Sequence, residues 1–220
     1  LMTRYVFIPA SGPLILFEYP NCEHIYQNNC TIDEVREVIS WDHFTWGNNV
    51  YDKALEWSKV VDDLMKQYSS ENKKLIIDVC DPAGINALNN NYEYDIINAQ
   101  KFMEIARSIK SQDEIICMKA SIKTAEKGIL LMHENLKAGM TEEELWSILH
   151  KTNIENGGEW FETRLLNSGP KTNPWFQECS NRIIEEGELV AFDTDMVGPY
   201  GYCADISRTF VEGKKLSNYQ

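Results

Sequence analysis

The sequence predicts an α/β (α+β) chain of two domains, and three observations support this fold class. Up to about residue 110, short apolar runs alternate with segments that repeat apolar residues at helical spacing. A polar stretch at residues 108–112 separates this half from the rest. Two helical segments follow, and then a hydrophobic strand that ends in aspartates. We therefore expect one domain over residues 1–110 and a second over residues 111–220.

The elements of the first half follow from local patterns. Ser11-Gly12 separates two strand-like runs and predicts a β-hairpin. Apolar residues at helical spacing predict a helix over residues 51–68. The other expected elements are a strand and then a loop within 31–49, a strand at 74–79 ended by Asp81-Pro82-Ala83-Gly84, a polar loop at 89–91 and a helix at 95–106.

The second half begins with residues 113–119, and a helix is predicted after them, ending at about residue 136. Gly139 suits its C-cap, and Thr141 with Glu144 forms a capping box for the next helix. These signals mark helix ends and carry no chemistry of their own. A buried strand is expected at 189–192, a turn at 198–201 and a returning strand at 206–211.

Three carboxylates gather around this hairpin. Successive side chains of a strand alternate between faces, so Asp193 and Asp195 project from the same face, and Asp205 returns beside them if the strands pair. Burying unpaired carboxylates costs several kcal/mol or more unless a cation compensates. The hairpin holds a single basic residue, Arg208. The pattern therefore predicts a divalent metal site with Asp193, Asp195 and Asp205 as ligands.

Composition excludes some classes of partner. The formal net charge of -13 argues against nucleic acid or an anionic membrane surface. No apolar run approaches the roughly 20 residues of a membrane span. The six cysteines are irregularly spaced without a C-x-x-C pair, which favours reduced thiols and a cytoplasmic protein. Because the sequence begins with Leu1 in strand-like sequence, we expect it to be a fragment whose true start is missing.

The hairpin resembles the first metal hairpin of the creatinase and aminopeptidase family, the pita-bread metalloenzymes. In that family an Asp ends a hydrophobic strand, a Gly-Tyr-rich turn follows, and a second Asp opens a strand that ends in Arg-Thr-Phe. The corresponding residues here are Asp193, Gly201-Tyr202 and the run from Asp205 to Phe210. The resemblance implies an incomplete creatinase-like N-terminal domain followed by the first half of a pita-bread catalytic domain. It also implies a homodimer.

The match departs from the ordinary family pattern in two places. Asp205 lies twelve residues after Asp193 and ten after Asp195, and the usual spacing falls between these values. An extra residue and an extra Asp resemble the DddP-type dimethylsulfoniopropionate lyases, a branch of the same fold. Peptidases of the family have a His after the Pro of the upstream Ser-Gly-Pro-Lys-Thr-Asn-Pro run, whereas Trp175 stands there in this chain.

This resemblance implies a metal-dependent β-elimination that converts dimethylsulfoniopropionate, a small zwitterion, to dimethyl sulfide and acrylate. Two divalent ions are expected, with iron favoured and zinc or manganese as alternatives. The general base and the remaining metal ligands are expected beyond Gln220. Aromatic faces would suit a sulfonium cation, and Trp175, Tyr200 and Tyr202 are the candidates. Two alternatives stay open: a dinuclear Xaa-Pro aminopeptidase or dipeptidase, and a catalytically inactive binding module.

Overall fold

The structure is a computed structural model that describes residues 4–26, 31–69 and 71–213. The chain forms two compact units, residues 1–108 and 109–220. Their division falls at the polar stretch that the sequence marks as a boundary, two residues before the expected position. No helix in the described residues is long and apolar enough to cross a membrane. The cysteines that the structure describes carry free thiols, and Cys30 lies outside the described residues.

The described residues of the first unit form two small sheets. In one, β1 and β2 form the predicted antiparallel hairpin, and β3 adds in parallel to β2. In the other, β4 and β5 pair in parallel. The strands are β1 Tyr5–Phe7, β2 Ile15–Glu18, β3 Glu34–Glu37, β4 Lys74–Ile77 and β5 Asp95–Asn98, and the helices are η1 Glu23–Tyr26, α1 His43–Trp46, η2 Gly47–Asn49, α2 Val50–Tyr68, α3 Pro82–Asn91 and α4 Gln100–Ser108.

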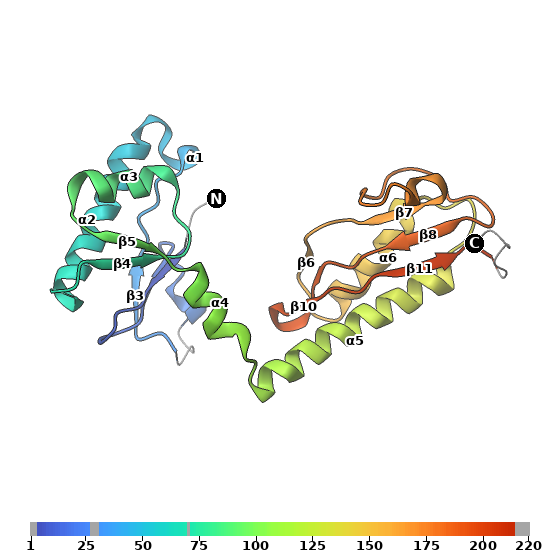
Figure 1. The fold of residues 1–220 in the computed structure, drawn as a ribbon, viewed down its shortest axis with the longest axis horizontal. Coiled ribbons are helices and arrows are strands. Elements are labelled where there is room, and N and C mark those ends of the chain that lie inside the picture. The colour runs from blue at the N-terminus through green and yellow to red at the C-terminus, as the bar shows by residue number, and fades with distance from the viewer. Residues whose placement is uncertain (1–3, 27–30, 70, 214–220) are drawn as a thin grey trace. The chain divides into compact units, whose positions relative to one another are not determined.

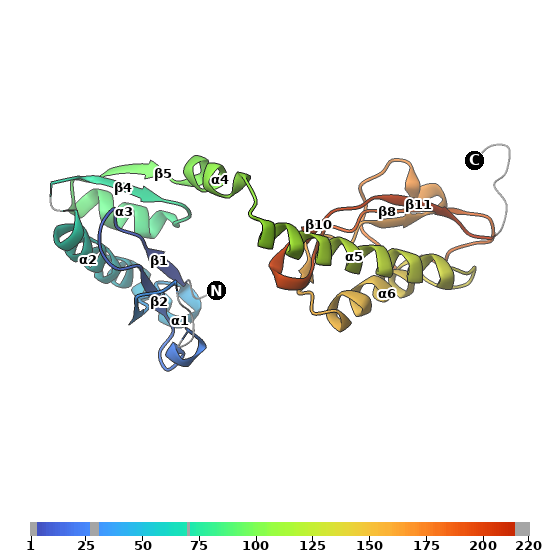
Figure 2. The ribbon, with the colours of Figure 1, turned by 90° about the horizontal axis from the view of Figure 1, so that it is seen from below.

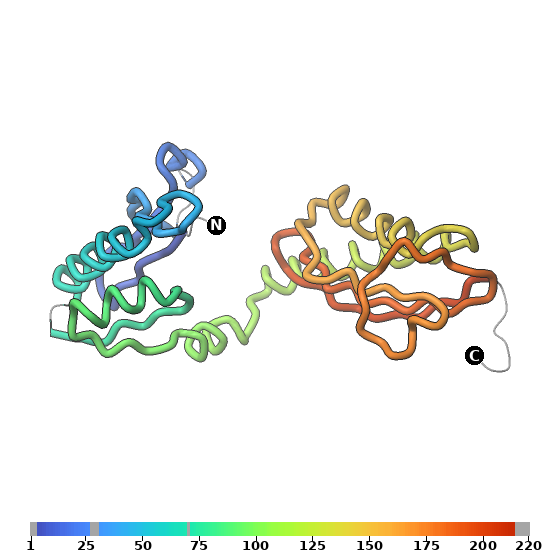
Figure 3. Tube along the Cα trace, turned by 90° about the horizontal axis from the view of Figure 1, so that it is seen from above, coloured from blue at the N-terminus to red at the C-terminus, as the bar shows by residue number. Residues whose placement is uncertain are grey.

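Helices α2 and α3 lie on one side of the β4–β5 pair (Figure 3). The buried apolar face of α2 has the helical spacing seen in the sequence, with Ala54, Trp57 and Val61 in the core. These side chains pack with Leu75 of β4 and Leu88 of α3. The predicted helix over residues 51–68 is therefore confirmed.

Three sequence predictions for this unit were wrong. Residues 89–91 continue α3, which Asp81 caps, instead of forming a loop, because Ala87 and Leu88 of this helix pack into the core. Residues 95–98 form β5 instead of starting a helix, because they pair in register with β4. The expected loop after β3 contains α1, which Asp42 caps by accepting from the Thr45 N–H at 2.9 Å.

In the second unit, the residues up to 213 that the structure describes form two long helices and two small antiparallel sheets (Figure 1). The strand orders are β11-β8-β7 and β10-β9-β6. The elements are α5 Gln112–Asn135, α6 Glu142–Glu155, β6 Trp160–Phe161, β7 Leu166–Ser168, η3 Gly169–Thr172, β8 Leu189–Phe192, β9 Met196–Val197, η4 Pro199–Gly201, β10 Cys203–Ala204 and β11 Arg208–Val211.

Both helices begin with capping boxes. Ser111 pairs with Glu114 at α5, and Thr141 pairs with Glu144 at α6, as the sequence predicted for the second. The C-cap of α5 is Leu136, so Gly139 does not cap this helix and instead occupies the following turn at a φ of 91°. The helix ends at Leu136, whose backbone is extended. Glycine is needed three residues later, because the turn there has a positive φ.

Helices α5 and α6 lie on the same side of the β7–β8–β11 sheet (Figure 2). The core between them and the sheet includes Met132, Leu145, Leu149, Leu166 and Phe192. Part of the connection between β7 and β8 projects on the opposite side of this sheet from α6 (Figures 2 and 3), whereas residues 180–184 hydrogen-bond with residues 139–143 at the start of α6. One face of the sheet is therefore a helix-covered core, to which Cys179 and Ile184 of this connection contribute.

Candidate metal centre

The strand register brings two short chain segments together. In one ladder Phe192 of β8 lies opposite Arg208 of β11, and in the other Met196 of β9 lies opposite Ala204 of β10. Residues 193–195, between β8 and β9, therefore lie beside residues 205–207, between β10 and β11. This juncture holds all three aspartates of the hairpin.

Side-chain alternation separates the acids from the core. Phe192, Thr194 and Met196 are buried, whereas Asp193 and Asp195 between them are only half-buried. The predicted common face of the two aspartates is therefore observed. Asp195 has a φ of 37°, a left-handed conformation that Asp tolerates better than most residues. This residue interrupts the strand between β8 and β9.

Thr194 connects the two segments through its side chain. Its hydroxyl donates to the Ala204 carbonyl at 2.8 Å and accepts from the Ile206 N–H at 2.9 Å. These backbone groups flank Asp205 on both sides, and Thr194 is completely buried. One hydroxyl on the core face therefore sets the position of Asp205 relative to Asp193 and Asp195 on the other face.

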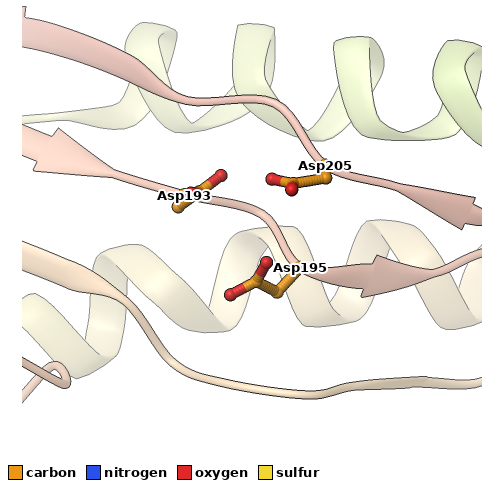
Figure 4. Close-up of side chains that lie close together, drawn as sticks. All are labelled: Asp193, Asp195 and Asp205. Atoms are coloured by element: carbon orange, nitrogen blue, oxygen red, sulfur yellow. The ribbon is translucent and has the colours of Figure 1, made fainter. Parts of the chain in front are cut away.

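Further hydrogen bonds orient the two remaining carboxylates. Asp193 accepts from the Thr194 N–H at 3.0 Å, and its own N–H donates to the Leu165 carbonyl at 2.9 Å. The Thr163 hydroxyl donates to Asp195 Oδ2. Figure 4 shows the three carboxylates converging, with α5 and α6 behind the strands.

The geometry is that of a cation site. Each aspartate offers an oxygen, and these atoms lie within 4.8 Å of one another. Hydrogen bonding to the Asp193 carboxyl, together with partial burial and repulsion by both neighbouring acids, raises the pKa of Asp205 to about 6. Arg208 Nη1 donates instead to the Ser207 carbonyl at 2.7 Å. Among the described side chains, no Lys or Arg forms an ion pair with the three acids, so their charge fits a divalent cation.

One premise of the sequence argument was wrong. The hydrophobic strand before Asp193 suggested that the carboxylates would be buried, but Asp193 and Asp195 are half-buried and Asp205 is exposed. The burial pattern explains the difference, since the apolar neighbours point to the helices and the acids to the opposite face. Partial loss of hydration and mutual repulsion therefore both make this cluster favourable for a cation.

The three aromatic candidates occupy two other places. Tyr200 lies in η4, is 74% exposed and has a φ of 64°. The Tyr202 hydroxyl donates to Glu114 Oε1 of α5 at 3.2 Å. Trp175 follows Pro174 in the β7–β8 connection and is 38% exposed. In the described residues no hydrogen bond or ring contact joins these side chains to the aspartates, so their role as substrate contacts stays a prediction.

The comparison with known proteins identifies the class first. Residues 116–220 match the profile of Metallopeptidase family M24, and this region belongs to that family. The chain as a whole is similar to two curated proteins named dimethylsulfoniopropionate lyase DddP. It is 36% identical to the one from Roseovarius nubinhibens over 215 residues, which cover 96% of this chain and 48% of the relative. It is 34% identical to the one from Roseobacter denitrificans, over 94% of this chain and 47% of the relative. The chain thus spans about half the length of the curated relatives it matches.

Solved structures agree on the fold. The prolidase from Pyrococcus furiosus matches with a TM-score of 0.76 at 19% identity, over 99% of this chain and 58% of the prolidase. The Xaa-Pro dipeptidase from Bacillus anthracis matches with a TM-score of 0.75 at 19% identity, over 99% of this chain and 56% of the dipeptidase. The predicted mixed α/β fold of the pita-bread class is therefore confirmed.

Sequence reasoning missed the two threonines that orient the acids. Thr194 stands between Asp193 and Asp195, and its place in the alternating pattern puts its hydroxyl on the buried face. A buried hydroxyl needs a hydrogen-bond partner, and this requirement was a usable signal. Thr163 offered no comparable signal, because it approaches Asp195 from a distant segment of the chain.

Proposed function

We propose that the whole protein is a metal-dependent carbon–sulfur lyase that cleaves dimethylsulfoniopropionate to dimethyl sulfide and acrylate. The observation that carries the proposal is the similarity to two proteins named DddP lyases along nearly the whole chain. The Asp-Thr-Asp run with Asp205 supports it, since the ordinary family pattern has no such second Asp in the first segment. We include in the proposal two divalent ions, with iron favoured over zinc or manganese, a homodimer and a cytoplasmic location.

The described residues would contribute the metal-holding half of the site. Asp193, Asp195 and Asp205 would hold the cation, and Thr194 and Thr163 would keep them in place. A divalent ion supplies a Lewis acid that stabilises negative charge developing on the substrate carboxylate. We place the general base beyond Gln220, in the half of the whole protein that this chain does not span.

The elimination balances without a redox partner. The base takes the proton from the carbon next to the carboxylate, and that electron pair becomes the second bond between the two carbons. The carbon–sulfur bond breaks and its electrons stay on sulfur, so neutral dimethyl sulfide leaves and acrylate remains. A sulfonium cation is stabilised by an aromatic face. We assign this role to Trp175, with Tyr200 and Tyr202 as further candidates.

The position of the β7–β8 connection supports the assignment of Trp175. Glu178 forms a bridge with Leu165, and Leu165 accepts from the Asp193 N–H. Two strand spacings therefore separate Glu178 from Asp193, which is about 10 Å.

The second candidate function is a dinuclear Xaa-Pro aminopeptidase or dipeptidase. The M24 match and the prolidase-like fold favour it. Trp175 in place of the family's His and the altered aspartate spacing oppose it. An inactive binding module is opposed by the intact carboxylate cluster, whose mutual repulsion would serve no purpose without a cation.

The test is a direct comparison of the two reactions. The whole protein, loaded in turn with iron, zinc and manganese, is given dimethylsulfoniopropionate or an Xaa-Pro dipeptide. Headspace gas chromatography measures dimethyl sulfide, and liquid chromatography measures acrylate and free proline. We expect equimolar dimethyl sulfide and acrylate with slow dipeptide hydrolysis. Asp193→Asn should abolish the release, and the exposed surface change Asp113→Asn should leave it intact. Rapid dipeptide hydrolysis without dimethyl sulfide would establish the aminopeptidase instead.

A further inference from the structure

A buried carboxylate outside the metal cluster has an unusual number of partners. Glu142 is the first residue of α6, and its side chain is fully buried. Glu142 Oε1 accepts from the Ser168 N–H and hydroxyl, both at 2.8 Å. Glu142 Oε2 accepts from Lys171 Nζ at 2.8 Å, the Ser180 N–H at 3.0 Å and the Ser180 hydroxyl at 2.8 Å. Capping a helix does not require these five donors, which all come from elsewhere in the chain.

The donors come from the two ends of one segment. Ser168 is the last residue of β7, Lys171 lies in η3, and Ser180 follows the segment 169–179. Lys171 Nζ also donates to the Glu178 carbonyl at 3.2 Å. The Glu142 carboxylate therefore holds both ends of segment 169–179. Lys171, near the start of the segment, also bonds to Glu178 near its end.

The charge of this carboxylate is well compensated. Burial alone would raise the pKa of Glu142, but hydrogen bonds from Lys171, Ser180 and Ser168 lower it below the ordinary value. The group thus remains an anion with five donors, a charge-assisted arrangement that is stronger than neutral hydrogen bonds. Removal of one donor or of the charge leaves buried polar groups without partners.

Segment 169–179 also reaches the metal-bearing part of the sheet. The Gln177 N–H donates to Asn167 Oδ1 at 3.4 Å, and Glu178 bridges Leu165 beside Asp193. Asn167 lies opposite Ala191 in the ladder. Ala191 is two residues before Asp193, so their side chains point to the same face of the sheet. Between the two anchored ends, Trp175 and Phe176 are 38% and 76% exposed. The segment therefore exposes two aromatic rings between two ends that are both anchored to the rest of the unit.

We propose that Glu142 is a positioning residue that fixes segment 169–179 and thereby sets where Trp175 meets a cationic substrate. The part of this inference that concerns substrate rests on the proposed function. Glu142 acts through Trp175 and contacts no reacting atom, so its loss should weaken substrate binding more than it slows the chemical step. The alternative is that Glu142 only stabilises the N-terminus of α6, where a negative charge is favourable in any case.

Glu144 provides the matched control for that alternative. It lies in the same first turn of α6, and its carboxylate accepts from the Thr141 N–H at 2.8 Å without contacting segment 169–179. Glu142→Gln and Glu144→Gln remove the same charge from the same turn. Lys171→Met is the second test variant, because it removes one arm of the network and leaves both serines bonded to Glu142.

The first measurement needs no substrate. Chymotrypsin cleavage after Phe176 reports how often the segment opens, and cleavage after Trp160 of β6 is the internal reference for loosening of the whole unit. We expect Glu142→Gln and Lys171→Met to raise the ratio of the two rates about tenfold or more, the factor that about 1.4 kcal/mol produces. Glu144→Gln should leave this ratio within about twofold of the original.

The second measurement is a double-mutant cycle on lyase kinetics in the whole protein. We expect Lys171→Met to raise KM about tenfold with kcat within about threefold, and to change KM by less than about twofold when Trp175 is already Ala. An unchanged cleavage ratio, or a KM effect that persists without Trp175, would overturn the inference. Absence of any lyase activity would refute the proposed function alone, and the cleavage ratio would still decide whether Glu142 holds the segment.

Discussion

Thr194→Val is the most direct test of how the fold builds the metal centre. The substitution keeps the shape of the side chain but removes the hydroxyl that joins Ala204 and Ile206. A buried polar group that loses its partner costs about 1–3 kcal/mol, so the two backbone groups together cost about 2–6 kcal/mol. This is a large part of the 5–15 kcal/mol that is typical of a whole domain.

The effect should be strongest around Asp205. We expect faster amide hydrogen exchange over residues 203–207, a lower unfolding temperature and weaker metal binding, because Asp205 loses its fixed position between two anchored backbone groups. Each 1.4 kcal/mol lost from the bound arrangement weakens metal affinity about tenfold. Exchange followed by mass spectrometry and metal titration of the whole protein measure both effects.

Two control variants separate the hydroxyl from general effects of mutation. Thr209→Val makes the same chemical change at an exposed position of β11 and should be nearly neutral. Thr194→Ser keeps the hydroxyl and should retain metal binding. If Thr194→Val showed the exchange rates and metal affinity of the unmodified protein, the hydroxyl would not position Asp205, and our account of the site would be refuted.

Three further predictions concern the acids and Trp175. Asp193→Ala or Asp205→Ala should lower the metal content of the whole protein at one or both positions, and full content by elemental analysis in both variants would refute the ligand assignment. In metal-free protein the pKa of Asp205 is raised from 3.8 to about 6, so its contribution to stability is present below pH 4 and is lost as the pH rises through 6. Asp205→Asn should remove this pH dependence, and the difference between the two unfolding curves across pH 4–7 isolates it from other groups. Trp175→His should not create a dipeptidase, because the aspartate spacing stays altered, and rapid dipeptide hydrolysis by this variant would show that residue 175 alone decides the reaction.

The hairpin could be predicted from the sequence because its information is local. Strand alternation alone put Asp193 and Asp195 on one face, and the turn between the strands brought back Asp205. The capping box of α6 was equally local, since Thr141 and Glu144 lie within one turn. The family resemblance added the fold, which the matched structures confirm.

The errors in the first unit have a different origin. Residues 95–98 have apolar residues that fit a helix or a strand, and only pairing with β4, a distant segment, decides between them. Residues 89–91 are three asparagines with weak helix propensity, and they stay helical because the capped helix before them packs Ala87 and Leu88 into the core. Tertiary contacts override local preference in both cases.

The residues that sequence reasoning undervalued share a physical feature. Thr194 and Glu142 are both fully buried polar side chains, and each satisfies backbone or side-chain groups from remote parts of the chain. Their partners cannot be found from periodicity, because the partners belong to other elements. What periodicity does reveal is the burial itself, and each buried polar group implies a partner that is worth seeking.

The arrangement of the centre indicates how its charge is tolerated. The acids repel one another, yet hydrogen bonds hold them in place: Thr194 bonds on the buried face, and Thr163 donates to the Asp195 carboxylate itself. The hydrogen bonds that oppose this repulsion are therefore made within the protein and do not depend on a bound ion. A centre built in this way is preorganised: its ligands already converge before binding, so a cation gains the full electrostatic attraction without first ordering the chain. Thr194 is central to this account because it is the one side chain that belongs to the acidic segment and bonds on both sides of Asp205.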